Sequence, residues 1–90
     1  MKSYFATFYV QYPYYFPHFL PIYEELKKRG EHVHFILATN QNSALMEKIA
    51  KENELDFSFG EKKLFDIETK FIFFANMYEL TNKLKAKTIF

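Results

Sequence analysis

Two nearly continuous apolar segments, joined by an amphipathic one, constrain the fold of this chain more than any other feature. The first segment reads SYFATFYV (3–10) and the second reads HVHFIL (32–37). Between them lie an aromatic loop, the amphipathic run LPIYEELKK and an Arg29-Gly30 turn. Two short strands connected through one helix form a βαβ unit, in which the strands run parallel. The chain therefore opens an α/β sheet whose first strand is covered on both faces.

The first helix is predicted to begin near His18, because Pro17 disfavours a helical residue before it. Pro21 is then expected in the first turn, where its missing N–H has no helical partner to lose. Gly30 is the predicted C-terminal stop. The side chains that recur at helical spacing and should face the sheet are Phe19, Ile22, Tyr23 and Leu26.

The rest of the chain continues the alternation of strands and helices. Strands are predicted over 32–38, 55–59 and 70–75, and 88–90 would begin another. A second helix, capped by Asn42 or Ser43, should run to about Glu52. Its predicted inward side chains are Leu45, Met46, Ile49 and Ala50.

Residues 64–70 fit either a helical turn or a loop, and Asn76 with Glu79 resembles a capping box that opens a third helix. The order of elements predicts one Rossmann-like domain over residues 1–90. Its mostly parallel sheet should have four to five strands, with helices on both faces.

Composition excludes several classes of function. Twelve Lys and Arg against eleven Asp and Glu give a net charge of +1, which is no footprint for nucleic acid. Without cysteine there is neither a disulfide framework nor thiolate chemistry, and this fits a cytoplasmic protein. No apolar run approaches the ~20 residues that cross a bilayer. The only glycines, Gly30 and Gly60, rule out a P-loop or dinucleotide fingerprint in this stretch, and no cofactor is predicted.

Ligands of open α/β sheets bind beyond the carboxyl ends of the strands, where the loops 11–18, 39–43 and 75–77 should lie. The first loop offers a helix N-terminus, which attracts anions, and flat rings with hydroxyl groups. One interpretation is a wall for a sugar or polyol-phosphate acceptor, with His18 as phosphate donor or base. The other is that the rings pack the loop onto this domain or onto a second one. The residues concerned are Tyr12, Tyr14, Tyr15 and His18.

The second loop, Thr39 to Ser43, carries Asn40 and Asn42, which could bind ligand hydroxyl groups or simply form a solvated loop and helix cap. His32 and His34 are two residues apart on one strand and therefore point to the same face. Two such histidines can bind a metal, but the spacing places no third ligand beside them, and no metal site is predicted. Nor does the spacing pair the acidic residues Asp56, Asp66 and Glu68 with a partner.

The segment HFLPIYEELKKRGEHVHFIL (18–37) resembles the start of the N-terminal Rossmann-like half of GT-B transferases. With the later FIFFANMYELTNKLKAKTIF (71–90), the chain resembles the CDP-glycerol glycerophosphotransferase family. In that family a strand followed by a His-Gly motif would come next, so the resemblance implies a truncated N-terminal part of a GT-B-type domain. No catalytic residue can be carried over from the family.

The resemblance implies a cytoplasmic transferase that moves glycerol phosphate or a sugar from a nucleotide-activated donor onto a cell-envelope polymer, such as a teichoic acid-like chain. The donor would be bound mainly by a missing C-terminal domain, and the polyol-phosphate or glycan acceptor by this one. Peripheral contact with the inner face of the cytoplasmic membrane is compatible with that role. The 90 residues alone are expected to be inactive. The alternatives are a small non-enzymatic α/β binding module and an inactive truncated fragment.

Overall fold

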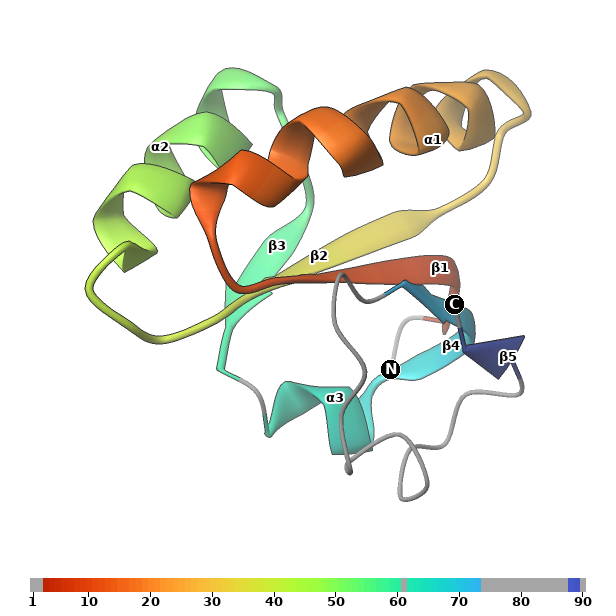
Figure 1. Cartoon of the computed structure of the whole chain (residues 1–90). Helices are drawn as coiled ribbons and strands as arrows, with labels where there is room; N and C mark the ends of the chain where they lie inside the picture. The colour runs from red at the N-terminus through yellow and green to blue at the C-terminus, as the bar shows by residue number, and fades with distance from the viewer. Residues whose placement is uncertain (1–2, 61, 74–87, 90) are drawn as a thin grey trace.

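The computed structural model describes residues 3–60, 62–73 and 88–89, which form one parallel sheet with helices on both faces (Figure 1). Helices α1 (Phe16–Lys28) and α2 (Ser43–Glu52) lie on one face, and the short α3 (Lys63–Asp66) lies on the other. A single turn of 3-10 helix, η1 (Pro13–Tyr15), precedes α1. The strands are β1 (Ser3–Val10), β2 (Val33–Leu37), β3 (Phe57–Phe59), β4 (Glu68–Phe73) and β5 (Thr88–Ile89).

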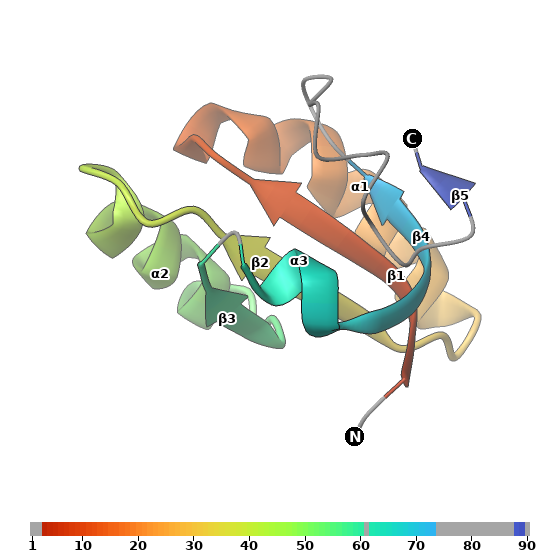
Figure 2. The same cartoon turned by 90° about the horizontal axis from the view of Figure 1, so that it is seen from below.

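The strand order is β3-β2-β1-β4-β5, and every neighbouring pair is parallel. From β1 the chain builds outward through β2 to β3, and then crosses to the other side of β1 to form β4, as Figure 2 shows from below. This confirms the predicted Rossmann-like α/β sheet. The direction of winding reverses between β1 and β4, and in such sheets the crevice beyond that point is the usual place for a ligand.

Aromatic rings build the core between the sheet and α1. Phe8 is fully buried on β1 and stacks on Phe35 of β2 at 4.9 Å and on Phe73 of β4 at 4.7 Å between ring centroids. Phe19 of α1 lies 5.1 Å from the same ring. One residue therefore joins three neighbouring strands and the first helix, which explains why the central strand is so rich in aromatic side chains.

Helix α1 begins two residues earlier than predicted, at Phe16, and the residue before Pro17 is helical after all (φ −56, ψ −44). The buried ring of Phe16 packs 6.1 Å from Phe35, and this contact outweighs the local preference. As a result Pro21 lies beyond the first turn, inside the helix.

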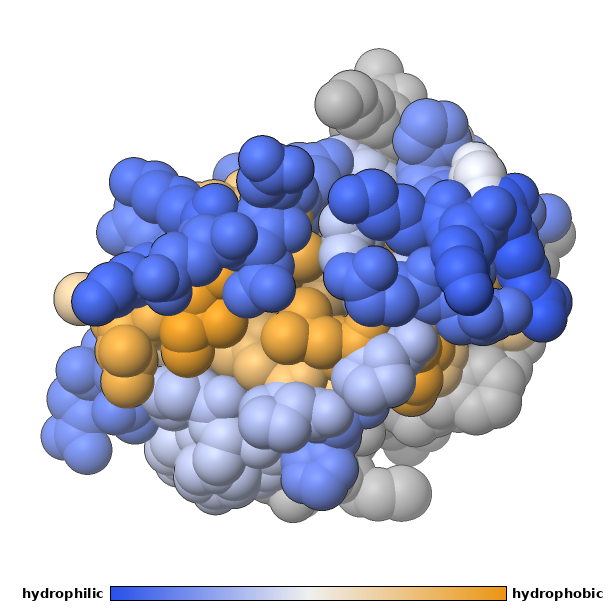
Figure 3. Space-filling model, turned by 90° about the horizontal axis from the view of Figure 1, so that it is seen from above, coloured by the Kyte–Doolittle hydropathy of each residue, from blue (hydrophilic) through white to orange (hydrophobic). Residues whose placement is uncertain are grey.

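Two side chains that were predicted to face the sheet face solvent instead. Ile22 is 39% exposed and Leu45 is 50% exposed. Each helix turns only a narrow stripe toward the sheet, and these two residues lie just beside it (Figure 3 shows apolar surface between polar margins on this side). The predicted inward residues that are buried are Phe19, Tyr23, Met46 and Ala50, while Leu26 and Ile49 are partly buried against the core.

β1 has the predicted bounds, the bounds of β2 and the beginnings of β3 and β4 differ from the predicted ones by one or two residues, and residues 63–70 divide between α3 and the beginning of β4. β4 begins at Glu68 rather than at Lys70, because the strand pairs with β1 from Ser3 onward. The third helix predicted from Asn76 lies outside the described residues, whereas Thr88 and Ile89 do form the predicted edge strand.

Both long helices end in a Schellman motif, but with different residues at the left-handed position. After α1, Gly30 (φ 79) donates to Lys27 and the next N–H returns to Leu26. After α2, Glu54 (φ 55) donates to Lys51 and the next N–H returns to Ala50. A side chain is unfavourable in this conformation and glycine is not, so only the first helix has the residue that suits its C-terminus.

Glu54→Gly is therefore expected to stabilise the chain by about 0.5–1 kcal/mol, and Gly30→Ala to destabilise it by about 1 kcal/mol. A Cβ at Gly30 would meet no atom within 4 Å, so the cost there arises from the backbone conformation alone. Urea unfolding of the two variants measures both effects. The two substitutions should change the free energy of unfolding in opposite directions. A Glu54→Gly variant that is less stable than the wild type would show that Glu54 does not adopt the left-handed conformation.

Candidate functional site

The first two predicted loops meet at the carboxyl edge of the sheet. Ala38, directly after β2, donates its N–H to the carbonyl of Val10 at 2.9 Å. The side-chain amide of Asn40 donates to the carbonyl of Gln11 at 2.8 Å, which ties the loop after β2 to the loop after β1. The structure thus brings Asn40 beside the aromatic segment. The third predicted loop, 75–77, lies outside the described residues.

Asn40 uses both ends of its side chain within the protein. Its Oδ1 accepts the N–H of Asn42 at 2.7 Å, and its own N–H donates to Ser43 Oγ at 2.8 Å. Ser43 Oγ also lies 2.9 Å from the carbonyl oxygen of Ala38. Asn42 is the N-cap residue of α2, as predicted, but its side chain makes no capping hydrogen bond, and Asn40 holds the turn that precedes the helix instead. We assign Asn40 a structural role, and Asn42 remains half-buried at the edge of the loop.

Tyr12, Tyr14 and Tyr15 form a tyrosine cluster on this edge. The rings of Tyr12 and Tyr14 are parallel within 2° at 5.5 Å between centroids, and Tyr15 meets Tyr14 edge-on at 4.6 Å. Tyr14 is 62% exposed and Tyr12 is 38% exposed, whereas the half-buried Tyr15 lies 6.4 Å from Phe19 of α1. Tyr15 thus anchors two aromatic rings that are open to solvent.

The phenol of Tyr14 is perturbed by its neighbours in the cluster. A hydrogen bond with Tyr15 raises its pKa above the ordinary value, with smaller contributions from desolvation and from the neighbouring rings. A neutral phenol is both a donor and an acceptor. The tyrosine cluster therefore combines flat apolar faces with hydroxyl groups that can donate to an anionic or polyhydroxylated ligand.

His18, the remaining predicted site residue, is exposed in the first turn of α1. No hydrogen bond or ion pair involves its imidazole among the described residues. The structure therefore places it on the same helix end that follows the tyrosine cluster, without a partner of its own in that part of the chain.

A second polar group, at the opposite end of the sheet, was not predicted from the sequence. His34 on β2 is 7% exposed, and its Nε2 lies 2.8 Å from Ser58 Oγ on β3. Its Nδ1 lies 3.3 Å from Asp56 Oδ1, and Tyr4 on β1 donates its hydroxyl to Asp56 Oδ2 at 3.0 Å. We call Tyr4, His34, Asp56 and Ser58 the polar network.

The polar network depends on a local irregularity of β1. The N–H groups of Phe5 and Ala6 both reach the carbonyl of His32, at 2.8 and 3.4 Å, which is the two-against-one pattern of a β-bulge. The bulge places Tyr4 on the face that carries His34, and the two rings lie 4.8 Å apart. Spacing along the sequence did not indicate the polar network, because its residues come from three separate segments of the chain.

The contacts of Ser58, His34 and Asp56 follow the order of a hydrolase triad, but the surroundings favour a structural role. Ser58 is in the middle of the three-residue strand β3, where its neighbours pair with β2. The polar network links β1, β2 and β3 by side-chain contacts and thereby fixes their register. His32, on the preceding turn, is exposed, and the described residues contain no group of three or more side chains that could hold a metal ion.

Tyr4 gives the polar network a dependence on alkaline pH. Burial, and then the hydrogen bond to Asp56, raises the pKa of Tyr4 from 10.0 to about 12. A raised pKa means that the stabilisation is complete below pH 10 and is lost as the pH rises toward 12. We expect the stability of the wild type to fall more steeply over this range than that of Tyr4→Phe. Urea unfolding of both proteins across these pH values measures the difference, and parallel curves would contradict it.

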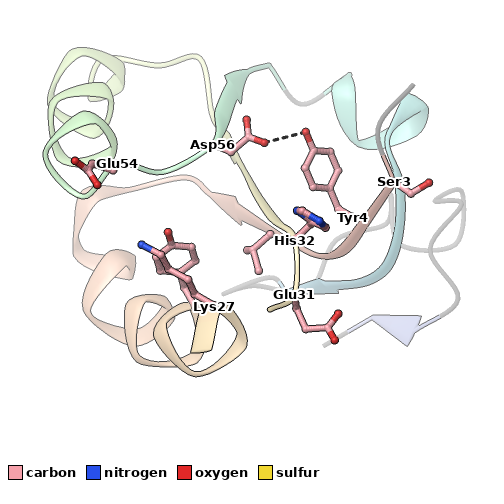
Figure 4. A pocket seen from close by; sticks show the side chains of 9 residues that line it. Ser3, Tyr4, Lys27, Glu31, His32, Glu54 and Asp56 are labelled. Carbon is pink, nitrogen blue, oxygen red and sulfur yellow. Dashed lines mark hydrogen bonds between the residues drawn. The ribbon is translucent and has the colours of Figure 1, made fainter. Parts of the chain in front are cut away.

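A pocket of about 280 Å³ adjoins the polar network at the amino end of the sheet (Figure 4). Tyr4 and Asp56 line its wall together with residues from α1 and from the turn that follows it. Both places, the tyrosine cluster at the carboxyl edge and this pocket at the amino end, offer chemistry to a ligand. They lie at opposite ends of the parallel strands.

Comparison with protein-family models, with curated proteins and with solved structures gives no significant match for this chain. None of the helices in the described part of the chain is long and apolar enough to cross a membrane.

Proposed function

We propose that this chain forms the acceptor-side part of a transferase that moves glycerol phosphate or a sugar from a nucleotide-activated donor onto a cell-envelope polymer. The observation that carries the proposal is the exposed tyrosine cluster at the carboxyl edge of a parallel β3-β2-β1-β4-β5 sheet. The sequence resemblance to CDP-glycerol glycerophosphotransferases supplies the reaction class.

The position of the tyrosine cluster supports ligand binding. It follows β1, the strand next to the reversal of winding, and the crevice beyond that reversal is where open α/β sheets bind their ligands. The hydrogen bond from Asn40 to Gln11 holds the neighbouring loop against it. A ligand at this edge would thus meet a surface that is ordered before it binds, which reduces the entropy lost on binding.

The chemistry of the tyrosine cluster suits a polyol-phosphate or glycan acceptor. The apolar faces of Tyr12 and Tyr14 can pack against the C–H groups of a sugar or glycerol unit, and their hydroxyl groups can donate to phosphate or hydroxyl oxygens. In the transfer reaction an acceptor hydroxyl oxygen attacks the activated centre of the donor, the bond to the nucleotide phosphate breaks, and a base takes the hydroxyl proton. His18 is the candidate base on this chain.

The remaining parts of the reaction are assigned to other components. A further domain would bind the nucleotide and stabilise the departing phosphate, so the 90 residues alone should bind an acceptor without transferring to it. A polymer that grows on a lipid would bring the chain to the inner face of the cytoplasmic membrane, which accords with a cytoplasmic enzyme in peripheral contact.

Binding of a short glycerol-phosphate oligomer, measured by calorimetry, tests the proposal. We expect Tyr14→Ala to weaken binding about tenfold, because a stacked aromatic ring contributes on the order of 1 kcal/mol or more. Tyr14→Phe keeps the ring and should lose about threefold, the effect of one hydrogen bond. The matched controls are Tyr4→Phe, at the other end of the sheet, and the exposed Ile22→Ala, both with wild-type affinity. Equal affinities of Tyr14→Ala and the control variants for the oligomer would overturn the proposal. So would the absence of any binding to the wild type.

A further inference from the structure

The pocket at the amino end has walls of two kinds, and neither belongs to the proposed acceptor site. Tyr4 and Tyr23 supply aromatic surface, from β1 and α1. Glu31, Glu54 and Asp56 supply carboxylates, from the turn after α1 and from the connection between α2 and β3. Figure 4 shows Asp56 beside Tyr4, with Lys27, Glu31 and Glu54 on the surrounding segments, so segments far apart in the sequence contribute to the pocket.

The charge of the pocket lining is unbalanced. Against the three carboxylates stands a single ammonium group, that of Lys27, and the remaining titratable lining residue is His32. The carboxylate of Asp56 already accepts a hydrogen bond from Tyr4 and lies beside His34, while Glu31 and Glu54 make no salt bridge among the described residues. A ligand with positive charge would therefore be attracted to this end of the protein.

The chain itself places a cation on the aromatic wall. The ammonium of Lys27 lies 5.8 Å from the centroid of the Tyr23 ring, within the range of a cation–π contact. Lys27 is exposed and long, so it can leave the ring for solvent at little cost, whereas the ring itself is buried and fixed. The contact places an ammonium group over the Tyr23 ring, and both residues line the pocket.

From these observations we propose that the pocket binds a compact organic cation with a primary ammonium or guanidinium group. The cation takes the place of the Lys27 ammonium over Tyr23 and pairs with Glu31 and Glu54. At about 280 Å³ the pocket is at the small end of ligand sites, which limits the ligand to a short aliphatic or similarly small skeleton. Because Lys27 competes for the same position, it weakens binding rather than supporting it.

Agmatine, which carries a guanidinium and an ammonium group, is the probe, and calorimetry on the whole chain gives its affinity. Glu54→Gln should weaken binding about threefold to fivefold, the range of a partly exposed charge pair, and Glu31→Gln should do the same. Lys27→Met should strengthen binding about fivefold, since it removes both the competitor and a repelling charge. Butane-1,4-diol, with a similar skeleton and no charge, should not bind.

Two control variants separate a site from general attraction between charges. Glu47→Gln removes the same charge from α2, where Glu47 pairs with Lys51 outside the pocket, and should leave the affinity unchanged. Lys48→Met, on the same helix, is the control for Lys27→Met. Equal effects of Glu47→Gln and Glu54→Gln, or equal effects of the two lysine variants, would overturn the proposal, and so would the absence of agmatine binding. None of these results bears on the tyrosine cluster.

Discussion

Phe8→Ala is expected to lower the free energy of unfolding by about 3–5 kcal/mol, the usual cost of removing a buried phenylalanine ring. Phe8 is 0% exposed and contacts rings from β2, β4 and α1, so a cavity there would open at the junction of the first helix with three strands. A domain of this size is stable by only about 5–10 kcal/mol, and such a loss would leave a substantial unfolded fraction at moderate temperature.

Urea unfolding followed by far-UV circular dichroism measures this effect. Phe8→Leu keeps most of the volume and should lose less than half as much, because the remaining side chain fills part of the space. Ile22→Ala, at a position that is 39% exposed, should lie within about 1 kcal/mol of the wild type. A similar cost for Phe8→Ala and Ile22→Ala would show that the aromatic cluster does not hold the sheet and α1 together.

His34→Ala is expected to destabilise the chain by about 2–4 kcal/mol, because it combines a cavity with the loss of partners for Ser58 and Asp56. The imidazole is 7% exposed. Its two nitrogens contact Ser58 on β3 and Asp56, which in turn is hydrogen-bonded to Tyr4 on β1. Truncation would leave the half-buried Ser58 hydroxyl without the hydrogen bond that it makes at 2.8 Å.

His32→Ala provides the matched control, since the same substitution two residues earlier removes an exposed imidazole and should change stability by less than about 0.5 kcal/mol. A double-mutant cycle between His34→Ala and Ser58→Ala should give a coupling energy of about 1 kcal/mol. Additive effects of the two substitutions would show that the contact between His34 and Ser58 does not help to join β2 and β3.

Most of the fold could be predicted from the sequence because its signals are local. The βαβ pattern of residues 3–37, the Gly30 stop and the apolar runs lead directly to a parallel Rossmann-like sheet. Local signals also explain the errors. Periodicity includes Ile22 and Leu45 in apolar stripes, but the width of the contact with the sheet depends on how each helix is rotated, which periodicity does not fix.

The two candidate sites differ in how far the sequence could predict them. The meeting of the loops at the carboxyl edge follows from parallel topology, and the hydrogen bond from the Asn40 side chain to the Gln11 carbonyl confirms it. The polar network could not be predicted, because it needs β3 beside β2 and a bulge that turns Tyr4 toward His34. Neither feature leaves a signal in the spacing of residues.

The most direct test of the central claim, an acceptor site at the carboxyl edge, is an NMR titration of the isotopically labelled 90-residue chain with a glycerol-phosphate oligomer. We predict saturable shifts of the backbone amides at Tyr12, Tyr14, Tyr15 and Asn42, with no change at Tyr4 and Asp56 on the opposite end of the strands. Shifts that concentrate around Tyr4 and Asp56, or no saturable shift at the tyrosine cluster, would contradict the proposed function.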